Sequence, residues 1–122
     1  SFLNKRKKIA KEYEKIFKNN SKIILPKQNK KNYNSYFFYP ILIKNRDRIS
    51  KTLKQNFGID TRVAYKMPIY KQKVYQSNKI KFKKLNCENA EYVTKNILNL
   101  PIYPLLKISQ AKYIAKCISN LV

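Results

Sequence analysis

Gly58 is the only glycine in this chain of 122 residues, which makes its position informative. It directly follows a segment in which Ile49, Leu53 and Phe57 recur at helical spacing, and Asp47 before them is of a residue type that favours a helix N-cap. Because glycine adopts a positive φ most easily, we expect Gly58 to end this helix. A single glycine also excludes a glycine-rich phosphate-binding loop.

Three further helices are predicted from the spacing of apolar residues. The first spans residues 2–17, where apolar side chains return at intervals of three, four and seven. The second starts at a cap formed by Asn86, directs Ala90, Val93 and Ile97 inward, and ends before the next proline. The last begins near residue 109 and should bury one apolar face, made of Ala111, Ile114, Ala115, Ile118 and Leu121.

Short strands are expected in three places. Residues 36–43 are rich in aromatic and β-branched side chains, and Pro40 among them cannot donate a ladder hydrogen bond, so this strand should lie at an edge or carry a bulge. Residues 61–65 and 98–100 indicate two more strands, and residues 67–84 an extended loop. The order of elements predicts an α+β fold in one domain over residues 1–122, with a small antiparallel sheet covered by helices.

The formal net charge of +22 suggests an anionic partner such as a nucleic acid. However, the charge comes from 24 lysines and only four arginines, and it is spread along the whole chain. Arginine is the residue suited to bidentate contacts with bases and phosphates. We therefore expect a solvated basic surface that binds nucleic acid only non-specifically. No apolar run is long enough to span a membrane, so no membrane partner is expected.

The residues that usually perform catalysis are scarce. The chain has no histidine, which removes the commonest general base and metal ligand. Glu88 and Glu91 fall on a predicted helix among lysines and are interpreted as surface charges. Cys87 and Cys117 fit no metal spacing and no disulfide framework, so reduced thiols in a cytoplasm are the simpler interpretation. A self-sufficient active site or metal site is not expected.

Ten tyrosines are present, and most are expected to bury the ring while the hydroxyl stays in water, as at Tyr13, Tyr92 and Tyr113 on helices. The tyrosines at 65, 70 and 75 differ, because their five-residue spacing matches neither a helix nor a strand. With the lysines beside them, they could line a pocket for an anionic ligand. They could equally pack against another domain.

Several segments, in order, resemble the DegT/StrS-type aminotransferases. Residues 58–75 resemble the family pattern G-I-x-T-x-V-H-Y-x-x-P-L-H-x-Q-x-x-Y, residues 6–13 its R-x-x-I-A-x-x-Y helix, and residues 99–104 its S-L-P-x-[HY]-P. Ser35, Tyr36 and the pair Arg46-Asp47 resemble a further strand and the R-D that follows it. The family often has histidine where this chain has Phe37, Ala64 and Tyr70, and Thr or Ser where it has Lys107.

The resemblance implies fold type I of the pyridoxal-phosphate enzymes, usually homodimeric, and places this chain in the small C-terminal domain that covers the active-site cleft. The large domain, with the cofactor and its Schiff-base lysine, would lie upstream, so this chain alone should hold no pyridoxal phosphate and no catalytic residue. Typical members transfer an amino group from glutamate to a nucleotide-linked keto sugar for glycan synthesis, and some relatives are dehydratases. The residues expected to contact substrate are Tyr65, Tyr70 and Lys71. The alternatives are a lysine-rich nucleic-acid-binding module and a non-catalytic remnant of the enzyme.

Overall fold

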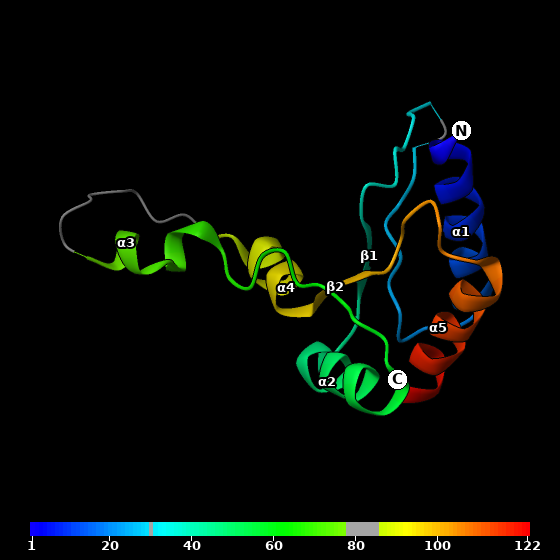
Figure 1. The fold of residues 1–122 in the computed structure, drawn as a ribbon. Coiled ribbons are helices and arrows are strands. Elements are labelled where there is room, and N and C mark those ends of the chain that lie inside the picture. The colour runs from blue at the N-terminus through cyan, green and yellow to red at the C-terminus, as the bar shows by residue number, and fades with distance from the viewer. Residues whose placement is uncertain (30, 78–85) are drawn as a thin grey trace.

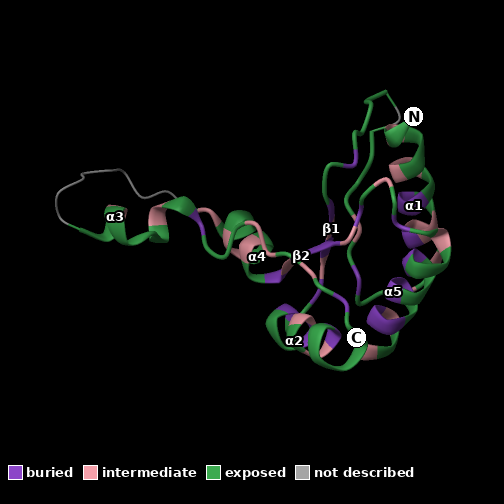
Figure 2. Ribbon diagram, viewed as in Figure 1, coloured by how far each residue is buried: buried purple, intermediate pink, exposed green. Residues whose placement is uncertain are grey.

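Two long helices and a small sheet enclose the core of the protein (Figure 1). The computed structural model describes residues 1–29, 31–77 and 86–122. Helix α1 spans Phe2–Phe17 and helix α5 spans Ile108–Leu121, close to the predicted bounds, and the two pack against each other. Their buried faces, purple in Figure 2, comprise Ile9, Ala10, Tyr13, Phe17, Ala111, Ile114, Ala115, Cys117 and Ile118.

Strands β1 (Tyr39–Leu42) and β2 (Ile97–Leu100) form an antiparallel pair in which Tyr39 faces Leu100 and Leu42 faces Ile97. A single bridge extends the sheet on each side, from Ile24 to Leu42 and from Arg62 to Asn99. The predicted α+β class with a small antiparallel sheet is confirmed. The strand predicted over residues 61–65 is reduced to the bridge at Arg62.

Pro40 fits the sheet without a bulge for a geometric reason. The N–H and C=O of Leu42 both bond to Ile24, at 3.0 Å each, so they point away from β2. Pro40 lies two residues earlier and points the same way, since successive residues of a strand alternate in direction. The missing proline N–H therefore removes no bond between β1 and β2.

Helix α2 (Arg46–Phe57) ends at Gly58 in the left-handed region, with φ +65°, as predicted. The N–H of Ile59 just beyond it donates to the carbonyl of Leu53 at 2.9 Å. The prediction of an Asp47 cap is wrong, because Asn45 occupies the N-cap position and Asp47 lies inside the first turn. Ile49 and Leu53 are buried as expected, whereas Phe57 at the helix end is exposed.

The helices η1 (Ile69–Lys71), α3 (Lys73–Gln76) and α4 (Glu88–Asn96) extend away from the core, and we call them together the arm (Figure 1). The loop predicted over residues 67–84 thus contains two short helices, and its residues 78–84 lie outside the described part. Ala90 and Val93 do not face inward but are exposed, because α4 projects past the edge of the core. Cys87, not Asn86, precedes α4, and β2 follows it directly.

The Tyr13 hydroxyl does not stay in water as predicted. Its side chain is fully buried, and the hydroxyl donates to the carbonyl of Pro101 at 2.7 Å, which ties α1 to the segment after β2. Tyr92 and Tyr113 are about half exposed, as expected. None of the helices in the described residues has both the length and the apolar character that a membrane crossing requires.

Candidate functional site

Arg46 joins the first turn of α2 to the end of α4. Its side chain is almost completely buried, and Nη1 donates to the carbonyls of Thr94 at 2.6 Å and Ile97 at 3.0 Å. Nε donates to Oδ1 of Asp47 at 2.8 Å. These carbonyls lie at the C-terminal end of a helix, where a cation is stabilised by the helix dipole. Arg46 therefore fixes the base of α4 against the core.

A carboxylate on α4 holds η1 in place. The Tyr70 hydroxyl donates to Oε1 of Glu91 at 2.6 Å, and Nζ of Lys71 lies 3.0 Å from Oε2 of the same carboxylate. Nε2 of Gln76 on α3 donates to the carbonyl of Tyr70 at 2.8 Å. We call Tyr70, Lys71 and Glu91 the clamp. The interpretation of Glu91 as a plain surface charge is wrong, because it connects two segments of the arm.

The clamp determines which hydrogen bonds Tyr70 can still make. The bond to Glu91 raises the pKa of Tyr70 to about 12, since ionisation would break the bond and place two negative charges side by side. Tyr70 is therefore a neutral phenol near neutral pH, and its single proton is engaged by Glu91. Only the lone pairs of its oxygen remain, so Tyr70 can accept from a ligand hydroxyl or amine but has no proton for a phosphate.

A cavity of about 550 Å³ lies between the first turn of α2, the segment before η1, and α4. Its charged lining comprises Arg46, Asp47, Lys66, Lys71, Glu91 and Lys95. Lysine ammonium groups suit the phosphates or carboxylates of a ligand, and the two carboxylates suit its hydroxyl or amino groups. Such a lining can bind and orient a polar anion, and its volume is typical of small-molecule sites.

The three substrate residues predicted from sequence have different environments. Tyr70 and Lys71 are brought together on Glu91, and Lys71 also lines the cavity. Tyr65 lies outside both the clamp and the cavity and is 71% exposed. The sequence reasoning did not identify Glu91 and Arg46 as functional residues. Glu91 lies 21 residues after Tyr70, and no local pattern marks such a pair.

Two kinds of catalytic group, a metal centre and a buried Schiff-base lysine, are not found among the described residues. They contain no group of three or more His, Cys, Asp or Glu side chains that could hold a metal ion. None of the lysines in the described residues is buried. A Schiff-base lysine needs a desolvated site that lowers its pKa, so the described residues do not fit a pyridoxal-phosphate site.

Comparison with known proteins shows similarity along the whole chain. The sequence profile of the DegT/DnrJ/EryC1/StrS aminotransferase family matches residues 1–119. A pleiotropic regulatory protein of Geobacillus stearothermophilus is 32% identical over 98 residues, which cover 80% of this chain and 26% of the relative. The chain thus spans about a quarter of the length of this curated relative.

Solved structures agree with this similarity. PseC of Helicobacter pylori, an aminotransferase involved in the biosynthesis of pseudoaminic acid, has a TM-score of 0.83 at 27% identity, covering 98% of this chain and 32% of PseC. DesV of S. venezuelae, solved in complex with a ketimine intermediate, has a TM-score of 0.86 over 99% of this chain and 32% of DesV. At 24% identity, the DesV match shows the fold alone.

Proposed function

Because this chain belongs to the DegT/DnrJ/EryC1/StrS aminotransferase family, we propose that it is the small C-terminal domain of a longer sugar aminotransferase, with residues 1–122 forming that one domain. The profile match over nearly the whole chain and the coverage of about a third of the solved relatives support this assignment. The substrate we propose is a nucleotide-linked keto sugar, with glutamate as the amino donor. The proposed enzyme is a cytoplasmic homodimer in amino-sugar synthesis, and the two free thiols are compatible with that location.

Aminotransferases of this family use pyridoxal phosphate, which supplies the electron sink for amino-group transfer. The Schiff-base lysine of the longer protein is expected outside this chain, since the described residues offer no buried lysine. The domain's contribution is to close one side of the cleft and to orient the substrate.

The clamp is the observation that supports this orienting role. Two neighbouring residues of η1 are fixed on one carboxylate of α4, so the acceptor oxygen of Tyr70 has a defined position. In this proposal, Tyr70 accepts a hydrogen bond from a sugar hydroxyl, and Lys66, Lys71 and Lys95 in the cavity attract the phosphates. Tyr65, which is exposed, packs on the substrate or on the large domain.

Steady-state kinetics on the full-length protein test the proposal. Tyr70→Phe removes the acceptor oxygen and should raise KM for the nucleotide sugar several-fold, because one neutral hydrogen bond contributes about 0.5–1.5 kcal/mol. Tyr113→Phe, a half-exposed tyrosine on α5, is the matched control and should change KM little. A lower melting temperature with unchanged kcat/KM would show that Tyr70 only supports packing.

The identity of the reaction is tested separately. The full-length protein loaded with pyridoxal phosphate should transfer the amino group of glutamate to a nucleotide-linked keto sugar. Absence of transfer with a range of such sugars, from a protein that does bind the cofactor, would favour the dehydratase relatives or a non-catalytic remnant. Absence of cofactor binding by the full-length protein would favour the remnant directly.

A further inference from the structure

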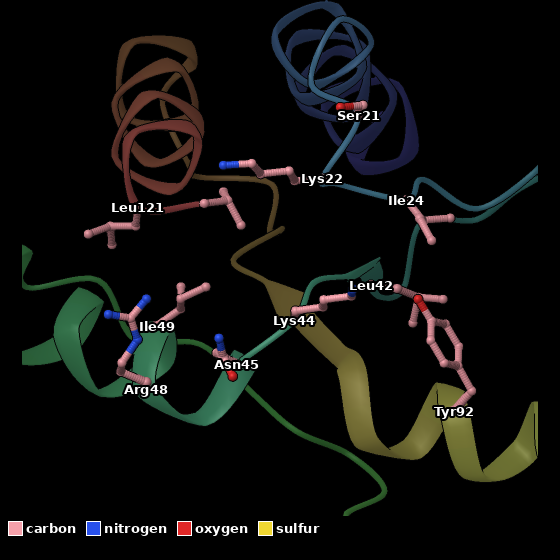
Figure 3. A pocket seen from close by; sticks show the side chains of 11 residues that line it. Ser21, Lys22, Ile24, Leu42, Lys44, Asn45, Arg48, Ile49, Tyr92 and Leu121 are labelled. Carbon is pink, nitrogen blue, oxygen red and sulfur yellow. The ribbon is translucent and has the colours of Figure 1, made fainter.

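A second cavity, of about 430 Å³, lies on the other side of the first turn of α2 (Figure 3). It is bordered by the segment after α1, the end of β1, α4 and the end of α5. Lys22, Lys44 and Arg48 contribute cationic side chains to its lining, and no Asp or Glu side chain lines it. Tyr92 is the only residue that lines both this cavity and the cavity beside the clamp.

None of the three cations forms an ion pair in the described part of the chain. The four ion pairs there involve Arg46, Lys54, Lys71 and Lys112, and none involves Lys22, Lys44 or Arg48. Like charges around one cavity repel one another, and a bound anion would relieve this repulsion. The lining thus has the electrostatic character of an anion site.

The backbone at this cavity adds to the positive potential. Asn45, at the N-cap of α2, has φ +56°, and its side chain makes no capping bond to the first-turn N–H groups. The N-terminus of a 12-residue helix therefore has no side-chain cap here, and the Asp47 carboxylate in its first turn offsets part of its positive potential. The helix terminus only reinforces the three cations, which carry the argument.

The remaining lining is apolar. Leu42, Ile49, Leu121 and Val122 form much of it, and the half-exposed ring of Tyr92 lies at one side (Figure 3). A free phosphate would leave most of this surface uncovered. A cavity of this volume has room for an organic group as well as a phosphoryl group.

We propose that this cavity binds a phosphorylated small molecule, with its organic part resting on the apolar lining and its phosphoryl group attracted by Lys22, Lys44 and Arg48, which border the cavity on different sides. Arg48 can bind the phosphoryl oxygens in a bidentate manner, whereas the two lysines act as point charges. The same ligand class follows whether or not the full-length protein is an aminotransferase, because only residues of this cavity are involved.

NMR titration of the chain with phenyl phosphate and with inorganic phosphate, at about 0.15 M salt to screen loose surface attraction, tests the proposal. We expect saturable shifts at residues of the cavity and at least threefold tighter binding of phenyl phosphate. The double variant Lys44→Gln/Arg48→Gln should weaken that binding at least tenfold. Both side chains are exposed, so the fold should persist, and a thermal melt checks this.

The matched control is Lys8→Gln/Lys116→Gln, which removes the same charge from exposed positions outside the cavity. If the two double variants weaken the binding of phenyl phosphate equally, the net charge of +22 explains the binding and the proposal is overturned. Absence of saturable binding by either anion would also overturn it. Equal affinity for the two anions would disprove the part of the proposal that concerns the organic group.

Discussion

Replacing Arg46 with methionine should destabilise the protein strongly. Methionine keeps much of the stem but removes the donors to Thr94, Ile97 and Asp47. Hydrogen bonds from a charged group contribute about 1.5–3 kcal/mol each, and a buried carbonyl left without a donor costs about 1–3 kcal/mol. Against this, the desolvation penalty of a nearly buried guanidinium is relieved by the substitution. We expect the loss to prevail, with a net destabilisation of about 2–4 kcal/mol.

Urea denaturation, monitored by circular dichroism, measures this difference. The matched control is Arg48→Met on the same helix, because Arg48 is exposed and has no ion pair in the described residues. Its stability should change by less than about 0.5 kcal/mol. If Arg46→Met costs less than about 1 kcal/mol, the desolvation penalty balances the hydrogen bonds, and the idea that Arg46 fixes α4 by these bonds is wrong.

Two further predictions follow from single contacts and a third from the net charge. The pKa of Tyr70 in the folded protein, about 12, lies above the ordinary value of 10.0. The bond to Glu91 should therefore stabilise the fold fully below about pH 10 and lose that effect as the pH rises through 12. The urea midpoints of the parent protein and of Tyr70→Phe should converge over this pH range, and a constant difference between them would contradict the assignment. At the N-cap of α5, the Lys107 side chain offers no acceptor, while the Gln110 side chain already accepts from the Lys107 N–H at 3.0 Å. Lys107→Ser should therefore complete a capping box and add about 0.5–1 kcal/mol of stability. A thermal melt that shows no gain would refute this. Duplex DNA should bind weakly, near ~10⁻⁴ to 10⁻⁶ M at physiological salt, with a steep salt dependence; a tight complex selective for one sequence would instead favour the binding-module alternative.

The features that the sequence predicted well are those decided by neighbouring residues. The apolar spacing of α1 and α5 predicts one buried face on each helix, and the two helices bury these faces by packing against each other. Gly58 ends α2 because a positive φ is a local preference of glycine. Pro40 also led the sequence to predict an edge strand or a bulge, and β1 is indeed an edge of the two-stranded sheet, because a residue without a donor is tolerated where no second strand pairs.

The family resemblance was also carried by the sequence, because its motifs are contiguous, and the comparisons confirm it. The prediction of an inward face for α4 was wrong because burial does not depend on neighbouring residues alone. The spacing of Ala90 and Val93 describes a possible apolar face, but burial requires a neighbouring element, and α4 projects beyond the core. An amphipathic pattern therefore predicts a helix better than it predicts what covers the helix.

The sequence by itself determined the helices α1, α2, α4 and α5, the glycine end of α2 and the family, since these depend on residues close together in the chain. The tertiary structure alone decided the partners of the polar side chains. Glu91 receives Tyr70 and Lys71, and Arg46 reaches Thr94, some 50 residues later in the chain. Hydrogen bonds and ion pairs require contact within a few ångströms, and only the folded backbone brings such distant residues that close.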